Sequence, residues 1–278
     1  MNARLLFILL LFTIGALWYI IGYWRRKAGE ATFAAARLTE KSEERERYCR
    51  LAVMAGHREA CRMFCLLHPE RFDGHSPHKP FKLRGIRISF YGYYYPSRYN
   101  ALLNDEQRAF CHSIYQFKQG DIHGIEFFKT CMNALQLKKR PYHIMFMPCS
   151  NWIKYGQRFK RLDWYIGKHR QDLTSGLYDV DICDARESLH EAKGGEKRIL
   201  ERNYLITGKI KGKEIIIIDD VLTTGQSVVD YKEEIERCGG KVVAAIFYGK
   251  TLSMPSMLLV QIHVWGNHIA HIIERMTK

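Results

Sequence analysis

The order of apolar and polar residues divides the chain into an N-terminal helical part and a C-terminal part where strands and helices alternate. Residues 5–24 are an uninterrupted apolar run, and residues 28–70 are rich in Ala, Glu and Arg, which predicts helices that end near Pro69. From about residue 104, amphipathic segments alternate with short apolar runs. Apolar strands separated by helices predict an α/β fold with a twisted, mostly parallel sheet and flanking helices.

The individual elements follow from the same pattern. Helices are expected at 104–120, where Asn104 caps the start and Gly120 ends the helix, and at 122–137, 155–170 and 226–240. Strands are expected at 86–99, 142–150, 178–184, 214–220, 241–249 and 257–266. Ligands of such sheets bind at the carboxyl ends of the strands. The functional residues are therefore sought there.

The apolar run at residues 5–24 has the length of a membrane-spanning helix. Aromatic residues gather at its end, and Arg25, Arg26 and Lys27 follow, which predicts a single-pass anchor with the C-terminal domain in the cytoplasm. A cleaved signal peptide is the alternative, but bulky aromatics and arginines stand where its cleavage site should lie. We therefore expect an uncleaved anchor and a membrane localisation.

Composition and linker signals complete the domain plan. We expect a transmembrane anchor at 1–27, a short helical hairpin at 28–72, a linker with two prolines at 73–84 and the α/β domain at 85–278. Residues 47–68 resemble one unit of a Sel1-type or tetratricopeptide-type hairpin, and residues 43–70 offer a surface for a protein partner. One unit cannot form a solenoid, so a simple amphipathic hairpin remains the alternative.

Charge and cysteine content limit the classes of partner. The 43 Lys and Arg residues exceed the 29 Asp and Glu residues, so the net charge is +14 and the partners should be anionic: phosphates, nucleic acid or a membrane surface. No CxxC occurs among the eight cysteines, which favours free thiols in a reduced compartment. His57, Cys61, Cys65 and His68 lie along one helical stripe, which cannot surround zinc tetrahedrally, so we expect packing rather than a metal site.

The stretch IIIIDDVLTTGQSV at residues 215–228 carries the clearest chemistry. Two acids, Asp219 and Asp220, stand at the carboxyl end of an apolar strand, and residues 221–227 form the turn and the start of the next helix. Free amides at a helix N-terminus bind anions, and hydroxyls and a glycine assist, so residues 223–227 predict a phosphate loop. Each of the two carboxylates can accept hydrogen bonds from hydroxyl groups, which suits the vicinal diol of a ribose. The stretch thus predicts a ribose 5-phosphate site, whereas the alternative is an ordinary strand–turn–helix with Asp as a cap.

At these residues the sequence resembles the type I phosphoribosyltransferases. Four segments follow, in order, the layout of the ComF-like branch over roughly residues 108–250: CHSIYQFKQGD, HIMFMPCSNWIKYGQRF, ARESLHEAKGGEKRILERNYLI and KGKEIIIIDDVLTTGQSV. The resemblance implies a Rossmann-like phosphoribosyltransferase fold, transfer of phosphoribosyl from phosphoribosyl pyrophosphate (PRPP) to a nitrogen nucleophile, and Mg²⁺ held through the pyrophosphate. The zinc module that usually begins the ComF-like proteins is missing.

The resemblance also assigns roles to single residues. It implies that Asp219 and Asp220 bind the ribose hydroxyls, and that the 5-phosphate is bound by Thr223, Thr224, Gly225, Gln226 and Ser227. It places the pyrophosphate loop at Cys149, Ser150, Asn151 and Arg158. Residues 186–198 fall on the mobile catalytic loop, where the cations that suit the leaving group are Arg186, His190, Lys193, Lys197 and Arg198, with Arg186 and Lys193 as catalytic candidates. No protein residue is expected to bind the metal directly.

Two positions depart from the family pattern. Gln226 stands where small residues are commoner, and Thr223 stands where some purine-specific relatives have an acid, which disfavours a purine acceptor. Two alternatives to an enzyme stay open: a PRPP-binding regulator without catalysis, and a ComF-like component of nucleic-acid handling, which the positive charge permits although no nucleic-acid-binding motif is present.

Overall fold

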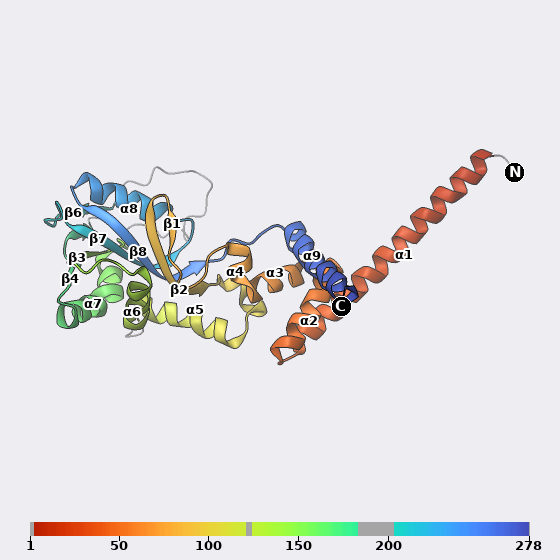
Figure 1. The fold of residues 1–278 in the computed structure, drawn as a ribbon, viewed down its shortest axis with the longest axis horizontal. Coiled ribbons are helices and arrows are strands. Elements are labelled where there is room, and N and C mark those ends of the chain that lie inside the picture. The colour runs from red at the N-terminus through yellow and green to blue at the C-terminus, as the bar shows by residue number, and fades with distance from the viewer. Residues whose placement is uncertain (1–2, 121–123, 183–202, 278) are drawn as a thin grey trace. The chain divides into compact units, whose positions relative to one another are not determined.

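The structure is a computed structural model that describes residues 3–120, 124–182 and 203–277. The chain forms two compact units, shown in Figure 1. The first comprises residues 1–74, 101–103 and 253–278, and the second comprises residues 75–100 and 104–252.

The first unit is helical in its described part. Its helices are α1 (Ala3–Leu38), α2 (Ser42–Met54), α3 (Arg58–Leu67), α4 (Pro69–Asp73) and α9 (Met257–Met276). The helices α2 and α3 form a hairpin, against which α9 packs. His57 begins α3 by accepting a hydrogen bond at Nδ1 from the backbone amide of Ala60, 3.2 Å away. The predicted stop near Pro69 is confirmed, because α3 ends at Leu67, and Pro69 begins the separate short helix α4, where proline is tolerated at the first position.

Helix α9 corrects the strand expected at 257–266. Ser256 caps the helix through its hydroxyl, which accepts a hydrogen bond from the amide of Leu259 at 3.4 Å. Val260 and Val264, four residues apart, are buried, whereas Leu258 and Ile262 are exposed. This spacing is helical. The apolar content of a short run does not by itself tell whether the run forms a helix or a buried strand.

The expected membrane anchor is also corrected. Among the described residues, no helix combines the length and the apolar character needed to cross a bilayer. The single-pass membrane localisation predicted from residues 5–24 is therefore wrong.

The cysteines of the α2–α3 hairpin pack as small apolar side chains. Cys49, Cys61 and Cys65 are all buried, and the thiol of Cys49 donates to the carbonyl oxygen of Ala60 at 3.3 Å. Burial raises the pKa of Cys61 to about 11 and that of Cys65 to about 12. These thiols therefore stay protonated at neutral pH.

The second unit is built on a six-stranded sheet whose order is β1-β2-β8-β7-β3-β4. The strands are β1 (Phe81–Leu83), β2 (Ile86–Tyr94), β3 (Tyr142–Phe146), β4 (Leu173–Ser175), β7 (Glu214–Leu222) and β8 (Lys241–Thr251). Among the described strands of this six-stranded sheet, β1 alone pairs in the antiparallel direction. The predicted α/β fold with a mostly parallel sheet is thus confirmed, and β1 lies inside the segment expected as a linker.

The described helices of this unit are α5 (Asp105–Lys118), α6 (Gly124–Leu135), α7 (Trp152–His169) and α8 (Gln226–Arg237), and a 3-10 turn covers Ser97–Leu102. Figure 1 shows α8 on one side of the sheet and α5, α6 and α7 on the other. Burial on both sides explains why Ile215–Ile218 form an uninterrupted apolar run that is fully buried. Asn104 and Gln107 form a capping box at the start of α5, as the sequence predicts for its cap.

A separate antiparallel hairpin joins β5 (Val180–Ile182) to β6 (Tyr204–Ile206). The strand expected at 178–184 therefore does not belong to the main sheet. The hairpin is tied to the sheet through Asp179, whose Oδ2 lies 2.6 Å from Nε2 of His143 on β3. Burial lowers the pKa of His143, and the neighbouring Lys213 lowers it further, although Asp179 opposes both.

Unequal strand lengths create the edge where the candidate site lies. Strand β3 stops pairing with β7 at Ile218, and the amide of Met147 makes the last hydrogen bond to the Ile218 carbonyl. On the other side, β8 pairs with β7 as far as Leu222. Asp219 and Asp220 therefore lie inside β7, as in the strand expected at 214–220, and beyond the end of β3.

Candidate functional site

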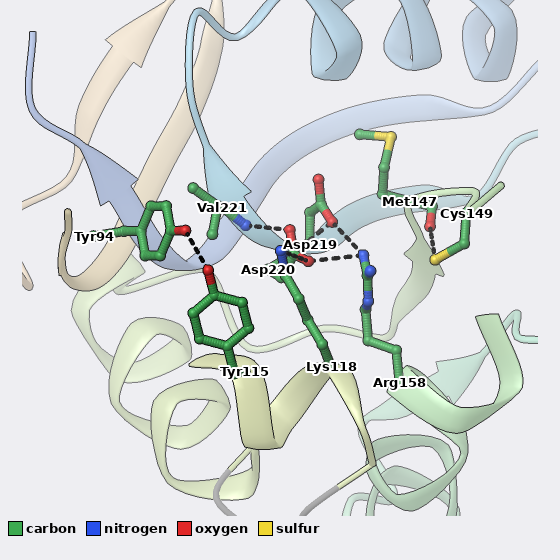
Figure 2. A network of polar contacts seen from close by, with 9 residues as sticks. All are labelled: Tyr94, Tyr115, Lys118, Met147, Cys149, Arg158, Asp219, Asp220 and Val221. Atoms are coloured by element: carbon green, nitrogen blue, oxygen red, sulfur yellow. Dashed lines mark hydrogen bonds and ion pairs between the residues drawn. The ribbon is translucent and has the colours of Figure 1, made fainter. Parts of the chain in front are cut away.

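The acidic pair, Asp219 and Asp220, lies at the centre of the candidate site (Figure 2). Asp219 Oδ1 accepts a hydrogen bond from the amide of Asp220 at 2.8 Å, and Asp220 Oδ1 accepts one from the amide of Val221 at 2.6 Å. One oxygen of each carboxylate is thus held by a backbone amide, and the second oxygen of Asp220 takes part in ion pairs.

Two cations neutralise the acidic pair. Arg158 on α7 places Nη1 at 2.9 Å from Asp220 Oδ2 and at 3.6 Å from Asp219 Oδ1. Lys118, the last residue of α5, places Nζ at 3.3 Å from the same Oδ2. Figure 2 shows both side chains reaching the acids from the helices on one side of the sheet. Arg158 is therefore an ion-pair partner of the acidic pair in this structure.

The environment of Asp219 favours its protonated form. Burial is the main cause and the charge of Asp220 the second, and together they raise the pKa of Asp219 to about 8, although Arg158 opposes the shift. At neutral pH the Asp219 carboxyl is therefore largely protonated. An added hydroxyl can accept from the protonated acid or donate to the ionised one.

The phosphate loop, residues 223–227, leads from β7 into α8. Gly225 has φ of 78° and occupies the N-cap position of α8, so the chain turns there as only glycine does easily. Among the described residues, the amides of the loop find a single acceptor, the hydroxyl of Thr224, which lies 3.4 Å from the Gln226 amide. Thr223, Thr224, Gln226 and Ser227 are exposed. The loop thus offers free amides and hydroxyls at a helix N-terminus, the arrangement that binds anions.

The segment expected as the pyrophosphate loop connects β3 to α7. Asn151 caps α7 by accepting from the amide of Lys154 at 2.9 Å. Cys149 is buried, its carbonyl accepts from the Asn203 side chain at 3.2 Å, and burial raises the pKa of its thiol to about 12. The Cys149 thiol is therefore neutral and unsuited to act as a nucleophile, whereas Ser150 is only partly buried.

Three residues of the site have no counterpart among the sequence candidates. Lys118 comes from α5, and Tyr94 on β2 and Tyr115 on α5 join their hydroxyls at 3.2 Å beside the acidic pair (Figure 2). They lie far from residues 219–227 in the sequence, so no local spacing could have pointed to them. Lys118 stands in one of the segments that carry the family resemblance, which is the only signal available for it.

The structure unites some of the predicted residues and leaves others apart. It brings together Asp219, Asp220 and Arg158, while within the described residues no hydrogen bond or ion pair joins the phosphate loop to them. Arg186, His190, Lys193, Lys197 and Arg198 lie outside the described residues.

Two comparisons find similarity between this chain and phosphoribosyltransferases. Residues 171–251 match the family model described as Phosphoribosyl transferase domain. Over 57 residues the chain is 42% identical to an orotate phosphoribosyltransferase of Sulfolobus acidocaldarius, a stretch that makes up 20% of this chain. The chain thus spans about a quarter (26%) of the length of that curated relative. Both likenesses are to phosphoribosyltransferases, and each covers only part of the chain.

Proposed function

We propose that this protein is a phosphoribosyltransferase that transfers the phosphoribosyl group of PRPP to a nitrogen nucleophile and releases pyrophosphate. The observation that carries the proposal is the juxtaposition, at one edge of a parallel sheet, of two carboxylates on β7 and an exposed strand-to-helix loop directly after them. The acids match a diol, and the loop matches a phosphate. The relative is named for this class of reaction, which supports the proposal.

The site supports a largely electrostatic mechanism. The acidic pair orients the ribose, and the phosphate loop anchors the 5-phosphate, so that C1 of the ribose is held at the sheet edge. The bond from C1 to the pyrophosphate oxygen breaks, and its electron pair leaves with pyrophosphate. The nitrogen nucleophile then bonds to C1 and loses its proton. Arg158 and Lys118 limit the charge of the acidic pair while the leaving group departs.

Magnesium fits this proposal only as an ion that arrives with the substrate. Within the described residues, no group of three or more His, Cys, Asp or Glu side chains could hold a metal. Mg²⁺ is commonly bound by one or two carboxylates and substrate phosphates, a role that Asp219 or Asp220 could serve. When bound, Mg²⁺ neutralises charge on the leaving pyrophosphate.

The test is pyrophosphate release from PRPP with a panel of nucleobases and amines, with the phosphoribosylated product identified by mass spectrometry. We expect pyrophosphate and product in equal amounts for at least one acceptor. PRPP that binds without turnover, with every acceptor and with water, would contradict an enzyme.

A PRPP-binding regulator without catalysis is the second candidate function. The observation that favours it is the direct ion pairing of the acidic pair with Arg158 and Lys118, because a ligand that replaces these contacts could shift the helices that carry them. Both functions require the acidic pair. Alanine at Asp219 and Asp220 together should abolish PRPP binding in calorimetry, and unchanged binding would refute both.

The finer expectations remain proposals. The ComF-like branch rests on the quoted segments, and the catalytic roles of Arg186 and Lys193 rest on the same resemblance. The domain limits at 28–72, 73–84 and 85–278 and the protein partner of residues 43–70 are also proposals. A role in nucleic-acid handling would require steeply salt-dependent binding of single-stranded DNA, which a titration at increasing salt measures directly.

A further inference from the structure

The turn between β1 and β2 lies against the phosphate loop. Arg84 Nη1 donates a hydrogen bond to Gln226 Oε1 at 2.7 Å, although the two residues are 142 positions apart. The side chain of Leu83 covers Gly225 so closely that a Cβ atom on that glycine would overlap Leu83 Cδ2. The contact therefore involves both a polar bond and packing, and it brings an arginine to the candidate phosphate site.

The backbone of the turn is held in a conformation that most residues avoid. Arg84 has φ of 45° and Gly85 has φ of 84°. Glycine adopts such angles easily, whereas the side chain of an arginine makes this conformation strained. An arginine at a strained position, with an exposed side chain, is better explained by the chemistry of its guanidinium than by the needs of the turn.

Gln226 holds the guanidinium in place. Its Nε2 donates to Asp230 Oδ1 at 2.6 Å, one turn further along α8, so its Oε1 faces Arg84. A guanidinium has five N–H donors, and Gln226 engages one of its nitrogens. Among the described residues, no carboxylate pairs directly with Arg84, so its charge and its remaining donors are available to an anion.

We propose that Arg84 is a binding residue for the phosphate held by residues 223–227, and that Gln226 is its positioning residue. This inference rests on the proposed function, because it concerns the same site, and it explains the glutamine that departs from the family pattern. The planar guanidinium would bind phosphate oxygens from the side opposite the loop amides. The phosphate site would then combine two segments that are remote in sequence.

The test measures calorimetric affinities of the full chain for ribose 5-phosphate, for inorganic phosphate and for ribose. We expect Arg84→Ala to lower the affinity for ribose 5-phosphate about 10- to 100-fold, the loss typical of one charge-assisted contact. The affinity for inorganic phosphate should fall in parallel, whereas the affinity for ribose should stay unchanged. Arg84→Lys should recover part of the affinity, and Gln226→Ala should weaken it less than Arg84→Ala does.

Two variants separate a binding role from other roles. Lys82→Ala removes one positive charge from an exposed position on β1, so it controls for general electrostatic attraction. Arg84→Gly relieves the backbone strain, so its melting temperature should equal or exceed that of the wild type while its affinity for ribose 5-phosphate falls. If the role of Arg84 were purely structural, the variants that lose affinity would also lose stability.

Each outcome decides between the two claims. If the wild type binds ribose 5-phosphate and Arg84→Ala and Arg84→Gly bind it within twofold of the wild type, the role of Arg84 is refuted and the proposed function stands. An equal loss in Lys82→Ala would refute it as well. If the wild type binds no phosphate-bearing ligand, both claims fail. If binding depends on Arg84 but PRPP is never turned over, the inference stands and the transfer reaction fails.

Discussion

The carboxyl of Asp219 gives the sharpest test of the electrostatics of the site, through the variant Asp219→Asn. Burial and the charge of Asp220 raise the pKa of Asp219 from an ordinary 3.8 to about 8. Between these two values the folded protein keeps the proton on Asp219 and the unfolded chain has released it. The folded state then binds more protons, so this group's contribution to the free energy of unfolding falls as pH rises.

The size of the effect follows from the same shift. One pKa unit corresponds to about 1.4 kcal/mol, so the contribution of Asp219 should fall by about 3 to 4 kcal/mol between roughly pH 5 and pH 8 and then level off. The asparagine of the variant would lack this dependence while still accepting the hydrogen bond from the Asp220 amide. Relative to the wild type, the variant should therefore gain stability steadily over this range.

Urea unfolding followed by circular dichroism, at intervals between roughly pH 5 and pH 9, measures this difference. The other acids and bases of the site are present in both proteins, so their titration largely cancels. Glu233→Gln, which removes an exposed carboxylate from α8, is the matched control and should show a nearly constant difference. A constant difference for Asp219→Asn across the range would mean that the carboxyl ionises as it does in the unfolded chain, and the reasoning would be wrong.

Two further predictions concern the residues around the acidic pair. Arg158→Ala leaves buried carboxylates short of a partner and should cost about 3 to 5 kcal/mol. Arg140→Ala removes a more exposed ion pair and should cost much less, so equal shifts in melting temperature would contradict this reasoning. Gly225→Ala should lower stability by more than Gly212→Ala does, because both glycines have positive φ but only Gly225 is covered by Leu83. The positive φ alone should cost about 1 kcal/mol at either position. Similar losses of stability in thermal unfolding would refute the close contact.

The sequence predicted what is local in the chain. The run from Ile215 to Ser227 contains a buried strand, two acids, a glycine turn and a helix start, and each part follows from its own residues. The exact end of β7 does not, because it depends on β8, which pairs as far as Leu222. Lys118 and Arg84 were missed for the same reason, since tertiary contacts bring them to the site.

The errors have a common physical origin. Residues 257–266 contain the apolar run of a strand, yet packing of Val260 and Val264 fixes a helix. The apolar content of a segment predicts that it will be buried, but it does not predict which part of the protein it will pack against. The run at residues 5–24 was interpreted by content in the same way, and the structure corrects that interpretation.

The position of β2 bears on how the chain is made on the ribosome. This strand is synthesised early, but its parallel neighbour is β8. Arg87 can therefore pair with Ala244 only after most of the chain has been synthesised. During synthesis its Tyr- and Phe-rich residues, among them Phe90 and Tyr93, have no strand partner in the sheet other than the short β1. Unpaired aromatic strands promote aggregation, and contacts between remote residues slow folding. The sheet is therefore expected to close late, and chaperones that shield β2 should raise the yield of folded protein.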